Sequence, residues 1–179
     1  ITVDALNDLD LVAVGIAGSL VRTTSSSEST SGDKSASLAG SFGWNELSGN
    51  TRAFIDAGSS HPPKKLILQA EQELSVLATR SGEIIAVSAG VAASLQDKKG
   101  KALELAGSVS VNDITNTTTA YIRGVQDDNP AAPSLLISPY GLSVTATDSS
   151  SIFAFAGALS FGIGGSNLAV GLSFSKNNI

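Results

Sequence analysis

The sequence contains no cysteine, only one histidine, and few charged residues. Without cysteine, the chain cannot form a disulfide or a thiolate metal site. The net charge of −5 disfavours nucleic acid as a partner, because phosphate binding needs clustered lysine and arginine. No apolar run approaches the ~20 residues of a membrane-spanning helix. No export signal is visible at Ile1, so we expect an exported protein to carry its signal outside this segment.

Small and apolar residues make up most of the chain instead. Hydrophobic residues account for 42% of the sequence and charged residues for 15%, whereas a disordered chain is richer in charge and poorer in Val, Ile, Leu and Phe. A length of 179 residues is sufficient to bury a core. The composition therefore predicts a folded chain.

Four short sequence blocks recur along the chain, the first three of them in three copies each. A first block recurs at residues 1–5, 74–78 and 142–146, with offsets of 73 and 68. A second block follows each start, at residues 11–14, 84–87 and 152–155. The third block is the clearest and has offsets of 67 and 65, at residues 39–47, 106–114 and 171–179. A fourth block is present twice, at residues 51–55 and 118–122. An internal repeat of this length is typical of solenoids and other stacked arrays.

Large and small residues alternate within these blocks, and a period of two is that of a β-strand. In the third block Leu105, Val109 and Val111 fall on one face, whereas Ser108 and Ser110 fall on the other. We expect the large-residue face to be buried between stacked strands. Alanine would also permit a helix over residues 84–95, but serine, glycine and β-branched residues there favour a strand.

The register of the blocks is kept from copy to copy, so equivalent residues can stack. Asn45, Asn112 and Asn177 occupy equivalent positions, which we interpret as strand ends where asparagine tolerates a left-handed turn. Stacked in register, their side chains would form an amide ladder. The connections between the second and third blocks differ in length, at residues 22–34, 96–101 and 162–167. Variable loops on a constant frame are typical of solenoids.

The sequence therefore predicts an all-β fold, a repeat β-solenoid (β-helix-like) of long alternating strands. We divide it into repeat 1 at residues 1–73, repeat 2 at 74–141 and a truncated repeat 3 at 142–179. These form one continuous array, which we expect to continue beyond this segment.

The repeated blocks resemble those of the leukotoxin-like filamentous adhesins, a family of large bacterial exoproteins. The segments that carry the resemblance are residues 107–114 (GSVSVNDI) and 116–122 (NTTTAYI), and it extends over nearly the whole chain. The resemblance implies a β-solenoid shaft on a bacterial surface. It implies no binding residue, because the shared pattern defines a scaffold.

Candidate catalytic chemistry is sparse. The single histidine, His61, precedes Pro62 and Pro63, and nothing in the sequence places a nucleophile and an orienting acid beside it. Residues 162–165 (GIGG) loosely resemble a phosphate loop but lack the following helix and lysine, so we predict a tight turn. We predict no catalytic residue, no cofactor-binding residue and no enzyme activity.

Two acidic clusters invite a calcium interpretation. Their residues are Asp4, Asn7, Asp8 and Asp10, and Asp127, Asp128 and Asn129. Neither has the spacing of an EF-hand or of the glycine-rich calcium repeat. We interpret both as solvated turn acids and predict no metal site.

Two polar segments remain. Asn116-Thr117-Thr118 fits a glycosylation acceptor, although strand-entry threonine is the favoured interpretation. Residues 23–31, rich in serine and threonine, are interpreted as a flexible solvated loop.

These observations favour a structural or adhesive segment of a large bacterial surface or secreted protein, located outside the cell or on its surface. Candidate partners are a host or matrix protein, a glycan, or neighbouring repeats of the same chain. An outer-membrane β-barrel fragment is an alternative, disfavoured because one Trp and two Tyr are too few for aromatic girdles. A polysaccharide-acting β-helix is another, disfavoured because no strand carries a pair of carboxylates.

Overall fold

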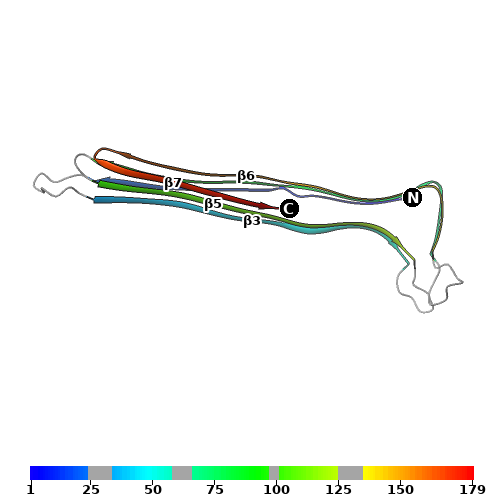
Figure 1. The fold of residues 1–179 in the computed structure, drawn as a ribbon. Coiled ribbons are helices and arrows are strands. Elements are labelled where there is room, and N and C mark those ends of the chain that lie inside the picture. The colour runs from blue at the N-terminus through cyan, green and yellow to red at the C-terminus, as the bar shows by residue number, and fades with distance from the viewer. Residues whose placement is uncertain (24–33, 58–65, 97–100, 125–134) are drawn as a thin grey trace, which may run out of the picture. The chain divides into compact units, whose positions relative to one another are not determined.

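The described part of the chain consists of β-strands joined by short connections. A computed structural model describes residues 1–23, 34–57, 66–96, 101–124 and 135–179 (Figure 1). For residues 135–139 it describes the backbone alone. The strands, in chain order, are β1 (Thr2–Asp8), β2 (Leu11–Thr23), β3 (Lys34–Asp56), β4 (Leu66–Gln96), β5 (Lys101–Arg123), β6 (Leu135–Ile163) and β7 (Ser166–Asn178). Residues 84–95 belong to β4, so the strand prediction there is confirmed. No helix among the described residues is long and apolar enough to cross a membrane.

The strands form two sheets with parallel pairing. In the first sheet β1 and β2 each pair in parallel with β4, and β6 also pairs with β4. The second sheet has the order β3-β5-β7, with β5 and β7 parallel. Parallel strands cannot be joined by a tight hairpin. Here the chain passes from one sheet to the other between β2 and β3, between β4 and β5, and between β6 and β7.

The register of the sheets follows the sequence repeat. Val3 pairs with Val76 and Val12 with Ile85, both at the offset of 73. Ala106 pairs with Gly171 at the offset of 65. The alignment of these blocks is therefore confirmed by the pairing.

The fourth block is also aligned as predicted. The rings of Phe54 and Tyr121, 67 residues apart, are stacked with centroids 5.2 Å apart and planes at 9°. The Ala57 N–H donates to the Arg123 carbonyl at 3.0 Å. β3 and β5 therefore run side by side in register.

The described chain divides into two compact units. Unit 1 comprises residues 1–9, 48–82 and 115–150, and unit 2 comprises residues 10–47, 83–114 and 151–179. Each unit takes residues from all three predicted repeats. The core of each unit is therefore shared between repeats, which is how solenoid repeats are stabilised.

The buried face of the strands in unit 2 is the small-residue face, so the expectation that the large residues are buried is wrong. Ala106 and Ser110 are 1% exposed, whereas Phe42 is 66% and Trp44 is 65% exposed. The reason is the close approach of the two sheets. A Cβ on Gly90 would lie 2.4 Å from the Gly107 carbonyl oxygen, so only small side chains fit between the backbones there.

Each unit also has a small apolar core. In unit 2, Leu47, Ile84, Ala86 and Ile114 are buried together. In unit 1, Ala53, Val76 and Ala78 form the buried cluster. Burial of such side chains is favourable by ~25 cal/mol per Å² of apolar surface.

The predicted tight turn at residues 162–165 is confirmed. Gly164 and Gly165 have φ values of +87° and +59° and connect β6 to β7. Such positive φ values favour glycine, and a Cβ on Gly164 would lie 2.0 Å from the Gln96 carbonyl oxygen. The corresponding connections at 24–33 and 97–100 lie outside the described residues.

Candidate functional surface

A ladder of three asparagine amides runs across the second sheet within unit 2. Asn45 Nδ2 donates to Asn112 Oδ1 at 2.7 Å, and Asn112 Nδ2 donates to Asn177 Oδ1 at 2.8 Å. Asn112 is 1% exposed, and Asn112 Nδ2 also lies 3.1 Å from the Ser110 hydroxyl that accepts from it. A buried amide is costly unless its hydrogen bonds are made. The predicted ladder is therefore present and fixes the register of the three strands.

Two of the three asparagines do not lie at strand ends, contrary to the sequence interpretation, whereas Asn177 is the last residue but one of β7. Asn45 and Asn112 lie inside β3 and β5, which continue to Asp56 and Arg123. No described residue other than glycine has a positive φ. These asparagines are retained in extended backbone because their side chains bond to one another, and not because they turn the chain.

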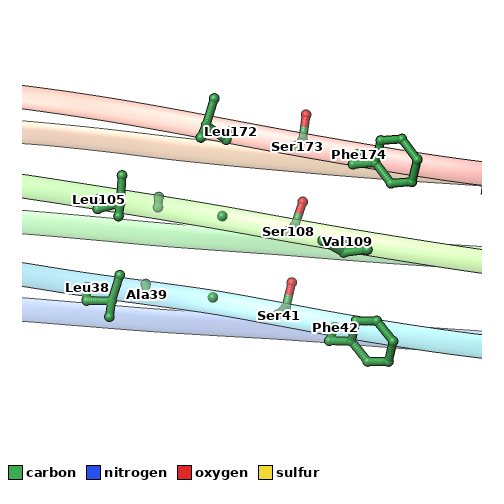
Figure 2. A pocket seen from close by; sticks show the side chains of 13 residues that line it. Leu38, Ala39, Ser41, Phe42, Leu105, Ser108, Val109, Leu172, Ser173 and Phe174 are labelled. Atoms are coloured by element: carbon green, nitrogen blue, oxygen red, sulfur yellow. The ribbon is translucent and has the colours of Figure 1, made fainter.

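The outer face of the second sheet in unit 2 is apolar and grooved. A groove of about 500 Å³ lies over Gly40 and Gly107. In Figure 2 Leu38 and Leu105 border one side, and Phe42, Val109 and Phe174 border the other. Leu172, the pairing partner of Gly107, occupies on β7 the position that the glycines leave open. The groove exists because glycine at these positions interrupts the rows of large side chains.

The lining of this groove carries no titratable side chain among the described residues. General acid–base or nucleophilic catalysis needs such groups within hydrogen-bond reach of a substrate. The chemistry available in the groove is contact with an apolar surface. The groove is therefore a candidate site for binding an apolar group.

The first sheet also carries large apolar side chains on its outer face in unit 2. The exposed ones are Val12, Val14, Ile16, Leu20, Phe153, Phe155, Leu159, Phe161 and Ile163. Monomeric soluble proteins rarely expose contiguous apolar patches above a few hundred Å². Both outer faces are therefore candidate interaction surfaces.

A buried arginine lies in unit 1. Arg80 is 1% exposed, and its Nε and Nη1 have no hydrogen-bond partner in the described part of the chain. A Cβ on Gly49 would lie 2.2 Å from Arg80 Nη1. Glycine at position 49 therefore provides the space for the guanidinium.

A buried carboxylate lies in unit 2. Glu104 is 0% exposed, the Ser94 hydroxyl donates to its Oε1, and its Oε2 has no partner among the described residues. Sequence reasoning did not single out Glu104 or Arg80. For Glu104 the available signal was a charged residue on the face that the alternation assigns to small residues.

A second polar group in unit 1 surrounds Asp148. The Ser150 hydroxyl and backbone N–H donate to Asp148 Oδ1 at 2.6 and 3.1 Å, and the Thr118 hydroxyl donates to Oδ2 at 3.2 Å. Desolvation by burial acts to raise the pKa of Asp148, but these hydrogen bonds outweigh it and lower the pKa below 3.8. Asn116 Nδ2 donates to the Ser150 hydroxyl at 2.8 Å, so the amide of the Asn-Thr-Thr motif is engaged within the fold.

An ion pair joins β3 and β5 within unit 1. The Arg123 guanidinium donates to Asp56 Oδ2, from Nε at 3.1 Å and from Nη2. The hydrogen bond to Asp56, with the charge of that carboxylate, raises the pKa of Arg123. Arg123 also lies over the Tyr121 ring, 5.6 Å from its centroid. These contacts reinforce the register of the fourth block.

The predicted candidate residues are only partly within the described chain. His61, Asp127, Asp128, Asn129 and residues 24–31 of the serine-rich run lie outside the described residues. Of the first acidic cluster, Asp8 Oδ1 accepts from the Ser81 hydroxyl at 2.8 Å. In the other unit, Asp10 Oδ1 accepts from the Glu83 N–H at 3.1 Å.

Asp4 is exposed and Asn7 half-buried. Across the ranges that the structure describes, no group of three or more His, Cys, Asp or Glu residues is placed to hold a metal ion. Asp4 and Asp8 lie in β1 and not in a turn, so that interpretation is wrong for them. Asp8 and Asp10 bond to the neighbouring strand. Comparison of the chain with protein-family models, with curated proteins and with solved structures finds no match.

Proposed function

We propose that this chain is a shaft segment of a large bacterial surface or secreted protein, built as a β-solenoid that carries adhesive or structural surfaces. The observation that supports this proposal best is parallel pairing at the repeat offsets in both sheets, 73 between β1 and β4 and 65 between β5 and β7. Each passage of the chain adds one level to each sheet. Repeating this step lengthens the stack, because each added level packs on the previous one in the same way.

The polar contacts between strands, both buried and exposed, support a structural role. The amides of Asn45, Asn112 and Asn177 bond to one another, and the charged groups of Asp56 and Arg123 do the same. Polar groups used in this way specify register and do not present reactive atoms to a ligand. We therefore propose a scaffold and not an enzyme.

The outer faces supply the adhesive part of the proposal. The exposed apolar rows, including Phe42, Trp44 and Phe174, suit contact with a host or matrix protein or with the apolar faces of glycan rings. The resemblance of residues 107–114 and 116–122 to filamentous adhesins supports a location outside the cell or on its surface. The groove over Gly40 and Gly107 is the part of this surface where a protruding side chain of a partner fits best.

A tandem protein tests the shaft, with residues 48–73 inserted between Ile179 of the first copy and Ile1 of the second to complete the third repeat. Strands in a sheet lie about 4.8 Å apart, so three further levels should add about 14 Å along the stacking direction and leave the strand direction unchanged. Small-angle X-ray scattering of the single and tandem proteins measures this difference. A tandem protein that scatters as two independently tumbling bodies would contradict the proposal.

A further inference from the structure

Large apolar side chains lie on both outer faces of unit 2, whereas small and polar side chains line much of its interior. Phe42 and Trp44 are exposed on the second sheet, and Val14 and Ile16 are exposed on the first. The buried residues of the unit include Ser37, Ala39, Asn45, Ser88, Ala92, Ser94, Ala106, Ser108, Ser110 and Asn112. A protein that docks on one outer face leaves the other face in water, whereas a hydrocarbon phase covers both.

Charged residues bound the apolar surface at both ends of the strands. The residues that face outward at positions 12–20, 36–44 and 103–111 are all uncharged, and we define these positions as the apolar band. The next outward residues on either side are Asp10 and Arg22, Lys34 and Glu46, and Lys101 and Asp113. The cations therefore lie at one end of the band and the carboxylates at the other.

The length of the band matches the apolar layer of a membrane. Each of the three stretches covers eight residue steps, which is about 26 Å at ~3.3 Å per residue. The apolar surface of strand-built membrane proteins is about 25 Å tall. Trp44 is the last outward residue before Glu46, and tryptophan is enriched at the membrane–water boundary. Lys176 pairs with Val111 at the same border, where a long side chain can extend its charge into water.

The outer face becomes polar where the same strands continue into unit 1. On β3 the exposed outward residues after Glu46 are Ser48, Asn50 and Arg52. On β5 the outward residues after Asp113 are threonines, at positions 115, 117 and 119. The apolar band is therefore a property of unit 2 and not of the strands as a whole.

We infer that unit 2 inserts into a lipid bilayer, with its strands crossing the hydrocarbon and the apolar band contacting acyl chains. The groove over Gly40 and Gly107 is open on this face and has the apolar lining that an acyl chain needs (Figure 2). The cationic end of the band suits anionic headgroups.

Backbone groups must be paired within a bilayer. β4 and β5 have strands on both sides, and adjoining repeats of the proposed array pair the outer strands in the same way. To that extent the inference rests on the proposed function. It adds a lipid bilayer to the partners proposed there.

The variant Ile16→Arg tests the insertion. Ile16 lies in the middle of the band on β2 and is 73% exposed, so the fold in water accepts a charge there, whereas the centre of a bilayer does not. Flotation with vesicles of phosphatidylcholine and phosphatidylglycerol measures binding. We expect the wild-type chain to float with the vesicles and the variant to need at least tenfold more lipid for half-maximal binding.

Leu6→Arg is the matched control. Leu6 is also 73% exposed on the outer face of its strand, but it lies in unit 1. This variant should bind at least as tightly as the wild type. A wild-type chain that does not float, or equal weakening by the two substitutions, would overturn the inference. Circular dichroism checks folding, and Phe42→Arg repeats the test on the second sheet if Ile16→Arg does not fold.

Fluorescence distinguishes crossing of the bilayer from contact through one face. Trp44, the single tryptophan, reports on the second sheet, and a fluorophore on Ile16→Cys reports on the first. Lipids brominated on their acyl chains should quench both. Quenching of one alone would overturn the crossing.

Self-association without lipid is the competing outcome. Oligomers that Ile16→Arg disperses, in a chain that does not bind vesicles, would assign the band to contact between copies and overturn the inference. Scattering of the tandem protein is measured without lipid, so failure of the proposed shaft is read out separately.

Discussion

Val109 and Ser110 are neighbours on β5 whose side chains point to opposite faces of the sheet. Ser110 is 1% exposed, whereas Val109 is half-buried on the outer face beside the groove. Burial of an unpaired charge costs several kcal/mol, whereas a substitution on an accessible face usually costs about 1 kcal/mol or less.

We therefore predict that Ser110→Asp destabilises the fold by about 3–5 kcal/mol and Val109→Asp by about 1 kcal/mol. Urea unfolding followed by circular dichroism measures both free energies of unfolding. The opposite order would show that the large-residue face is the buried one, as the sequence alone suggested.

Gly49 and Gly15 form a second comparison at the residue scale. A Cβ on Gly49 meets the Arg80 guanidinium, whereas a Cβ on Gly15 has nothing within 4 Å. We predict that Gly49→Ala costs about 1–3 kcal/mol because the buried guanidinium must shift. Gly15→Ala should be neutral or slightly stabilising, because it restricts the unfolded chain. Thermal unfolding of the two variants decides this, and equal midpoints would mean that Arg80 does not depend on Gly49 for its space.

At the scale of the elements, strand type and register were predictable from the sequence. The alternation around Val109 and the offsets between equivalent blocks needed only local periodicity and self-comparison. Val12 indeed pairs with Ile85, and Ala106 with Gly171. The amide ladder followed from the same alignment, since equivalent residues on paired strands lie side by side.

The buried face was not predictable by the same reasoning. The alternation of large and small residues shows that the two faces of a strand differ, but it does not predict how closely two sheets approach each other. That distance depends on contacts such as Gly90 against Gly107, which join residues of different sheets. A rule that places large apolar residues inside fails where the backbones leave room only for alanine, serine and glycine. Glu104 is a second example: it is buried because its side chain lies on the inward face of β5, although glutamate is usually exposed.

The polar interior also explains why asparagine was misassigned to turns. Asparagine is a common residue in turns. Asn112 nevertheless lies in the middle of a strand, and its amide bonds to an asparagine on either side. A single copy of the block does not distinguish these roles. Only the recurrence of asparagine at Asn45 and Asn177 does so, because a ladder needs all of its members.

At the scale of the whole molecule, stability is shared between copies of the repeat. Each compact unit takes residues from all three predicted repeats, so no repeat has a core of its own. In such arrays stability is approximately a sum of the repeats and their nearest-neighbour interfaces. This arrangement suits a shaft, because further repeats can be added without enlarging the core of any one level.

The same arrangement places large side chains outside. Phe153, Phe155 and Trp44 are each more than half exposed, and exposure on this scale usually marks an interaction surface. We expect a partner, if it is a matrix protein or a glycan, to contact these apolar rows at the spacing of the strands.

The central claim is that copies of the repeat stack as parallel neighbours at the repeat offset, and a disulfide measures this directly. The chain has no cysteine, so the pair Val109→Cys and Phe174→Cys introduces only two thiols. These residues are pairing partners on β5 and β7, within the Cα separation of about 4.4–6.8 Å that a disulfide spans. In the control pair, Val111→Cys replaces Val109→Cys and shifts the register by two residues, beyond that reach.

Mass spectrometry after mild oxidation of the monomer reads out the intramolecular bond. We predict rapid and nearly complete bond formation between positions 109 and 174, and little between positions 111 and 174. Equal bond formation in the two pairs, or none in either, would contradict the parallel register on which the fold and the proposed shaft both depend.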